Sequence, residues 1–203
     1  MIEGFSENRP DKDLAERERR FDELWQKTID ARSDFIDYEL PYPKHEFLEY
    51  LAHNKPVLLH GSNWTGLDPL EPRLANCRAK KFGNLVGVYA TQDDILPLFH
   101  AIRDPKKWRG RSSSGYTERQ DPGAGLIQKQ YDFAAEQRIL ESNPWGDGVI
   151  YILPRDAFEQ GTSDDGNPID EFVSRTPVAP LSRLRVSPQD FPYLNQVATL
   201  SEE

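Results

Sequence analysis

The chain has 203 residues, of which 37% are hydrophobic, 29% charged and 11% aromatic. The aromatic residues include four tryptophans, which excludes wholesale disorder, because disordered chains lack the large apolar groups that offset the entropy cost of ordering. The net charge of −9 at pH 7 disfavours general nucleic-acid binding, since a negative surface repels phosphate backbones.

Cysteine use and hydropathy indicate the compartment. Cys77 is the only cysteine, so no internal disulfide can form, which fits a reducing cytosol. Its basic neighbours Arg78, Lys80 and Lys81 favour a lowered pKa, but without a local partner we interpret it as an ordinary thiol. The N-terminus has no apolar signal core, and no stretch approaches the ~20 apolar residues of a membrane span. We therefore expect a cytoplasmic protein without a membrane partner.

The first quarter of the chain is predicted to be helical. Residues 1–10 are expected to form a disordered tail, and residues 11–54 a helical region that packs on the core. From Asp11 to about Asp34 apolar residues recur at helical spacing on one face. They are Phe21, Leu24, Trp25 and Ile29. Pro41 and Pro43 separate this helix from a second one at 44–52.

Residues 55–203 are predicted to form the core of a single domain. Short β-rich runs alternate with loops and turns, without the strict strand–helix alternation of doubly wound folds. The expected strands are 55–60, 84–90, 130–133, 149–153, 171–174 and 178–186. The sequence therefore predicts an α+β fold, with a mixed or antiparallel split sheet and peripheral helices.

The remaining stretches of the core are predicted to be one helix, two loops and two turns. Thr91 is the expected N-cap of a helix at 92–102, because its hydroxyl can accept an orphan amide bond. A long loop at 64–84 is expected to wrap a site, and 103–125 to form a charged, flexible loop. Turns are expected at 144–148 and 161–168.

Three short motifs combine residue types that bind ligands. The first is His60-Gly61-Ser62, where a strand delivers an imidazole, a glycine and a hydroxyl. The second is Tyr89-Ala90-Thr91, an aromatic residue at a strand end followed by a helix, and the third is Glu171, which opens a late strand. Each has a plain structural reading: a hydrogen-bonded histidine, a half-buried tyrosine and a solvated glutamate.

The order of the three motifs resembles the His-Tyr-Glu branch of the ADP-ribosyltransferase superfamily. In that branch a first core strand ends in His-Gly-Ser or His-Gly-Thr, a second carries the tyrosine, and a late strand carries the glutamate. The resemblance covers roughly residues 55–102 and 165–187. It implies an ADP-ribosyltransferase-like core that binds NAD+ as a substrate, to which the helical region is an N-terminal extension. The implied reaction is transfer of ADP-ribose to an acceptor, or hydrolysis of NAD+.

The resemblance also implies a role for each residue. Gly61 and Ser62 would lie at the nicotinamide, where the missing Cβ of glycine lets the backbone approach a carboxamide. His60 would hydrogen-bond a ribose hydroxyl and would be catalytic together with Glu171. Tyr89 would stack on the cationic pyridinium ring, and Thr91 would also bind NAD+. Glu171 would stabilise the positive charge that develops on the ribose. We expect His60 and Tyr89 to lie on adjacent strands, with their side chains lining a common groove.

The sequence departs from other site patterns. Ile169 stands two residues before Glu171, so the double-acid motif of arginine-modifying enzymes is absent. No Rossmann-type glycine fingerprint occurs, and His45, His53 and His100 are scattered without zinc-ligand spacing. We expect no metal. The protein or nucleic-acid acceptor is unknown, and two alternatives stay open: a non-catalytic binding module with the same fold, and an interaction protein that binds through its N-terminal helix.

Overall fold

The structure is a computed structural model that describes residues 9–74, 85–120, 127–163 and 165–200. These residues form four α-helices and ten strands. Cys77 and its basic neighbours, the second half of the predicted loop 64–84 and the tail residues 1–8 lie outside the described residues.

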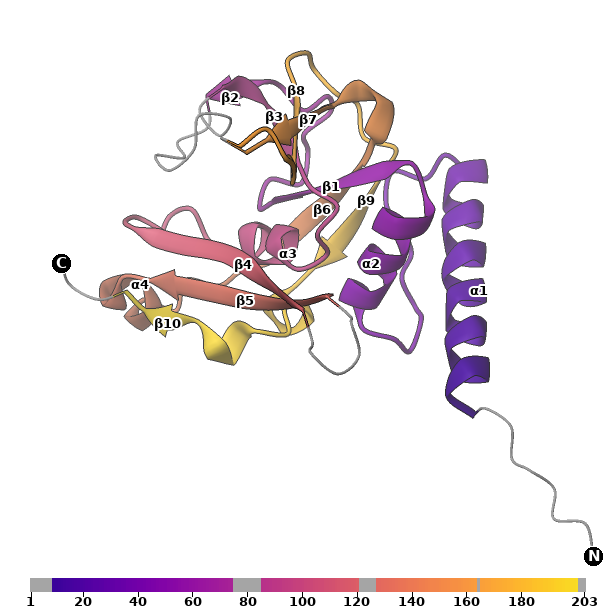
Figure 1. Ribbon diagram of the computed structural model, residues 1–203, viewed down its shortest axis with the longest axis horizontal. Helices are drawn as coiled ribbons and strands as arrows, with labels where there is room; N and C mark the ends of the chain where they lie inside the picture. The colour runs from indigo at the N-terminus through magenta and orange to yellow at the C-terminus, as the bar shows by residue number, and fades with distance from the viewer. Residues whose placement is uncertain (1–8, 75–84, 121–126, 164, 201–203) are drawn as a thin grey trace, which may run out of the picture.

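A three-stranded antiparallel sheet, in the order β1-β6-β9, divides the molecule (Figure 1). Its central strand β6 (Gly148–Pro154) pairs with β1 (Val57–Ser62) and with β9 (Ser182–Val186). The run Val-Ile-Tyr-Ile-Leu from Val149 to Leu153 is completely buried. Both faces of this strand are covered, which explains a continuous apolar run in place of an alternating one.

The larger core covers one face of the sheet. Helices α1 (Arg9–Asp30), α2 (Lys44–Asn54) and α3 (Leu96–Ala101) pack there. A hairpin of β4 (Ser112–Gln120) and β5 (Ile127–Ala135) packs against the same core. The short strand β10 (Ala198–Thr199) pairs with β5 and adds a third strand to the hairpin. Figure 1 shows α1 at the outer side of α2. Phe21 and Trp25 of α1 are buried against this core, as the helical pattern predicts.

A second, smaller core covers the opposite face of the sheet. A four-stranded antiparallel sheet, in the order β2-β3-β8-β7, packs over this second core. These strands are β2 (Arg73–Leu74), β3 (Val86–Ala90), β7 (Glu159–Thr162) and β8 (Pro168–Ser174). Val88 and Ala90 of β3 and Phe172 of β8 pack there against Tyr151 of β6. The two sheets thus enclose an apolar layer between them.

Short helical elements complete the chain. Helix α4 (Gln137–Glu141) follows the hairpin. Three 3₁₀ turns are η2 (Arg155–Ala157), η3 (Pro188–Asp190) and η4 (Leu194–Gln196). The prediction of an α+β fold with mixed or antiparallel sheet and peripheral helices is confirmed: of the three sheets that the described residues form, two are antiparallel and the sheet β10-β5-β4 is mixed.

Several boundaries predicted from the sequence are wrong. The segment 103–125 is not a loop throughout, because residues 112–120 form β4, which pairs along its whole length with β5. The turn expected at 161–168 contains the end of β7 and the start of β8. Only residues 182–186 of the stretch 178–186 form a strand, while Val178 makes an isolated bridge to Leu70. The first helix begins at Arg9, inside the expected tail.

The helix predicted at 92–102 is shorter than expected and begins differently. It starts at Leu96, and the carboxylate of Asp93 accepts the amides of Ile95 and Leu96 at 3.0 and 2.7 Å. Thr91 is therefore not the N-cap. Its hydroxyl accepts the amide of Asp93 at 3.0 Å, in the turn that precedes the helix.

Candidate functional site

The candidate site lies where β1 and β3 separate. The two strands meet in a single antiparallel bridge, in which Leu59 and Thr91 exchange backbone hydrogen bonds of 2.8 and 3.0 Å. In antiparallel strands the N–H and C=O of every second residue point to the same side. The amide and carbonyl of Gly61 therefore point toward the side of β3, and among the described residues no backbone group of β3 bonds them.

The other side of Gly61 is filled by α3. A Cβ added to Gly61 would lie 2.6 Å from the carbonyl carbon of Pro97, and closer still to its carbonyl oxygen. A backbone contact of this kind cannot be relieved by a rotamer change. The glycine of the first motif is therefore required by helix packing, whether or not a ligand binds at its polar edge.

The side chains of Tyr89 and Glu171 share one face of the β3–β8 pair. Tyr89 lies opposite Val173 in the register, and Glu171 is two residues from Val173 on β8. Val88 and Ala90 face the second core, so the alternation of side chains turns Tyr89 the other way. The Tyr89 hydroxyl bonds the amide and carbonyl of Leu85, both at 2.9 Å. This bond fixes the ring at the start of its own strand.

His60 lies on the opposite face from Tyr89. Its register partner is Tyr151, and the two ring centroids are 6.2 Å apart on the side of the second core. The expectation that the side chains of His60 and Tyr89 line a common groove is therefore wrong, because alternate residues of a strand point to opposite faces. The two residues still touch, since His60 Nδ1 lies 2.7 Å from the carbonyl oxygen of Tyr89.

That contact fixes the tautomer of His60. A carbonyl oxygen can only accept, so Nδ1 donates and Nε2 is left as an acceptor on a neutral ring. Burial lowers the pKa of His60, the bond to the Tyr89 carbonyl opposes this shift, and the positive charge of Arg73 lowers it further. His60 is accordingly neutral at pH 7 and can accept a hydrogen bond from a hydroxyl group.

The two hydroxyl residues of the motifs have local partners. Ser62 Oγ accepts the amide of Trp64 at 3.1 Å, and the Thr91 hydroxyl accepts the amide of Asp93. Both shape the turn that follows their strand. Gly61, Tyr89, Thr91 and Glu171 thus lie in the region of the split. The hydroxyls of Ser62 and Thr91 stabilise the turns that follow the two strands.

The β4–β5 hairpin, which the sequence does not predict, contacts the same region. The carboxylate of Asp93, fully buried, accepts the Lys129 ammonium at 2.8 Å and the Tyr131 hydroxyl at 2.7 Å. Burial lowers the pKa of Lys129, but the hydrogen bond and charge of Asp93 outweigh burial and raise it overall. Burial, and next the charge of Asp170, raises the pKa of Tyr116. The hairpin therefore lies close enough to the start of β8 for the charge of Asp170, next to Glu171, to act on Tyr116.

Two basic residues, His100 and Arg103, contact each other at the end of α3. The Arg103 guanidinium donates to Nδ1 of His100 at 2.6 Å, so this nitrogen carries no hydrogen. Burial lowers the pKa of Arg103 to about 10. Burial also lowers the pKa of His100 strongly, and the charges of Arg103 and His60 add to the shift. The effect of His60 on the pKa of His100 agrees with the packing of α3 against β1 at Gly61.

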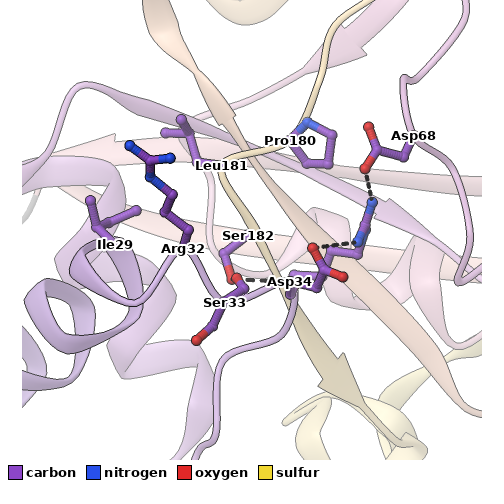
Figure 2. A pocket seen from close by; sticks show the side chains of 9 residues that line it. Ile29, Arg32, Ser33, Asp34, Asp68, Pro180, Leu181 and Ser182 are labelled. Atoms are coloured by element: carbon purple, nitrogen blue, oxygen red, sulfur yellow. Dashed lines mark hydrogen bonds and ion pairs between the residues drawn. The ribbon is translucent and has the colours of Figure 1, made fainter.

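A cavity of about 390 Å³ lies elsewhere, at the junction of α1 and β9. Figure 2 shows its side chains, among them Arg32, Asp34 and Leu181. Arg183, also in its lining, donates to the carboxylate of Asp68 at 2.8 Å. None of the residues predicted from the three motifs lines this cavity, so the structure separates it from the strand split.

The described residues hold no cluster of three or more His, Cys, Asp or Glu side chains suited to a metal ion. Within the same part of the chain, no helix is both long and apolar enough to cross a membrane. No protein-family model, no curated protein and no solved structure matches this chain. What the site does must therefore be argued from its own residues.

Proposed function

We propose that this protein binds NAD+ at the split between β1 and β3 and breaks the bond between nicotinamide and ribose. The observation that carries the proposal is the backbone edge of Gly61, which no described backbone group of β3 bonds, beside the face that Tyr89 and Glu171 share. A primary carboxamide offers both a donor and an acceptor. One strand residue whose N–H and C=O point the same way offers the complementary pair.

The neighbouring residues suit the rest of the nicotinamide ribose. The pyridinium ring is a cation, and the face of the half-buried Tyr89 ring attracts it through the aromatic quadrupole. The His60 side chain lies on the opposite face from Tyr89, so it could accept only a ribose hydroxyl that reaches across the strand split. Its Nε2 is the acceptor, because its other nitrogen is committed to the Tyr89 carbonyl. These contacts bind the ground state of the dinucleotide.

Glu171 supplies the charge that the reaction requires. As the bond between ribose C1′ and the nicotinamide nitrogen breaks, its electron pair returns to the pyridine ring and positive charge develops on the ribose. The Glu171 carboxylate stabilises that charge. A hydroxyl oxygen of water or of an acceptor then bonds to C1′ and releases its proton, so that free nicotinamide and an ADP-ribosyl product result.

The test has a binding arm and a reaction arm. Calorimetry measures NAD+ affinity, and chromatography measures nicotinamide released by the purified protein. Glu171→Gln keeps the size of the side chain, so turnover should fall about 10²–10³-fold while affinity changes little. Glu39→Gln, at an exposed position, is the matched control and should behave as wild type.

The tyrosine offers a second comparison. Tyr89→Ala should weaken NAD+ binding through lost stacking, whereas Tyr89→Phe keeps the ring and loses the hydroxyl that bonds Leu85. Binding without nicotinamide release would favour the non-catalytic module. Absence of both binding and release in the wild type would refute the proposal.

A further inference from the structure

Trp64 is a large aromatic side chain held at the surface. It is 54% exposed, although single exposed apolar residues alone need no explanation. The backbone of Trp64, however, is fixed on both sides. Its amide donates to Ser62 Oγ at 3.1 Å, and its carbonyl accepts the hydroxyl of the buried Tyr151. Because the backbone is already fixed, binding at this ring costs less ordering than binding at a mobile loop.

Tyr151 ties the rest of the same loop to the central sheet. Its hydroxyl also accepts the amide of Leu67 at 3.1 Å. The neighbouring Arg183 donates to the carbonyl of Leu67 and to the carboxylate of Asp68. Tyr151 and Arg183 are paired in the β6–β9 register. The loop after β1 is therefore anchored to a rigid element, and Trp64 with it.

A cation lies against the exposed ring. The Arg73 guanidinium carbon is 4.9 Å from the centroid of Trp64, within the range of a cation–π contact. Among the described residues no carboxylate pairs with Arg73. In a chain with a net charge of −9, an exposed arginine that pairs with none of the described carboxylates marks a local place where an anion is attracted.

Trp64 and Arg73 lie close to the backbone edge of Gly61, where nicotinamide is proposed to bind. Trp64 is three residues from Gly61, so the chain limits their Cα separation to roughly 10 Å. The charge of Arg73 lowers the pKa of His60, which places the guanidinium near that ring. Trp64 and Arg73, together called the aromatic platform, therefore border the site on the side away from α3.

We propose that the aromatic platform binds a purine nucleotide: the base stacks on Trp64 and a phosphate pairs with Arg73. Adenine has an extended planar face and no charge, so it stacks on an indole ring, while phosphate and guanidinium form charge-assisted hydrogen bonds. If the proposed function holds, this nucleotide is the adenylate half of NAD+. The assignment of that half rests on the proposed function, but the recognition of a purine nucleotide does not.

The probe is AMP, which contains the base and one phosphate but no nicotinamide. Calorimetry and quenching of tryptophan fluorescence measure its binding to the full chain. Trp64→Ala should weaken AMP binding about 5- to 100-fold, with Trp64→Phe between it and wild type. Arg73→Met should weaken binding and flatten its dependence on salt. Adenosine, which lacks the phosphate, should respond to Trp64→Ala but not to Arg73→Met.

Leu74→Ala is the matched control, because Leu74 is 71% exposed and follows Arg73 on β2. It should bind AMP as the wild type does, and thermal unfolding shows that each variant is folded. AMP binding that depends on Trp64, in a protein that releases no nicotinamide, would support the platform and refute the cleavage reaction. NAD+ cleavage with unchanged AMP and NAD+ affinities in Trp64→Ala would overturn the platform alone. A wild type that binds neither AMP nor NAD+ would overturn both.

Discussion

Replacing Gly61 by alanine adds one methyl group at the contact between β1 and α3. That methyl carbon would lie 2.6 and 2.9 Å from the carbonyl carbon and Cα of Pro97. Carbon atoms in ordinary contact are about 3.5–4.0 Å apart, so α3 must move away from β1 by roughly 1 Å. Pro97, Leu98 and Phe99 are buried, so this shift disturbs the larger core.

The expected cost follows from that geometry. Overpacking of a dense core typically costs about 1–3 kcal/mol. In a chain of this size each kcal/mol lowers the melting temperature by about 2–4 °C, so the fall should be roughly 2 to 12 °C. Thermal unfolding followed by circular dichroism measures it, and urea unfolding gives the corresponding free energy.

Gly115→Ala is the control for this experiment. No heavy atom lies within 4 Å of a Cβ added at Gly115, so alanine there should leave stability unchanged or raise it by about 0.5–1 kcal/mol. If Gly61→Ala is as stable as Gly115→Ala, the helix does not require the glycine, and this account of the packing fails. A stable Gly61→Ala protein that has lost NAD+ binding would instead assign the glycine to the ligand alone.

Three further changes test other parts of the site. Asp93→Asn removes the negative charge and turns one of the two acceptor oxygens into an NH2 donor. Either the α3 amides or the Lys129 and Tyr131 donors then lose their acceptor, so the free energy of unfolding should fall by about 2–4 kcal/mol. The exposed Asp132→Asn should have no effect, and equal stability of the two variants would contradict the buried pair. Burial, and next the charge of Asp93, raises the pKa of Asp94 to about 7. The folded state then keeps a proton that the unfolded state loses near pH 4, so stability should decrease as pH rises between these values, and Asp94→Asn should remove that slope. Tyr151→Phe leaves the carbonyl of Trp64 and the amide of Leu67 without their hydroxyl partner, so the free energy of unfolding in urea should fall by about 1–2 kcal/mol. AMP binding should also weaken if the loop positions Trp64. Unchanged stability and binding would show that the loop does not depend on this hydroxyl.

The apolar periods of the sequence predict its helices and buried strands well. Phe21 and Trp25 mark the buried face of α1, and the Val149–Leu153 run marks the central strand. These signals succeed because burial of large apolar side chains dominates the folding free energy. The order and antiparallel pairing of the strands do not follow from such periods, since pairing depends on contacts distant in sequence.

The β4–β5 hairpin shows where local patterns fail. Residues 112–116 read Ser-Ser-Ser-Gly-Tyr, a composition typical of loops. The strand forms because β5 offers a partner over its whole length and because Tyr116 and Tyr131 pair across the two strands, with centroids 5.6 Å apart. The alternation of Tyr131 and Phe133 is the local signal that favours a longer β5. Lys129 could not be identified as part of the site without this hairpin.

The three motifs also serve the fold, which limits what their presence says about function. Gly61 is required by the packing of α3, and the hydroxyls of Ser62 and Thr91 stabilise turns. The Tyr89 hydroxyl bonds the backbone of Leu85. A fold of this kind would select the same residues without any ligand. The structural demands do not account for a Gly61 edge that β3 leaves unbonded among the described residues, or for a tryptophan fixed at the surface. Those two features, and not the motif match, are the stronger reasons to look for a nucleotide.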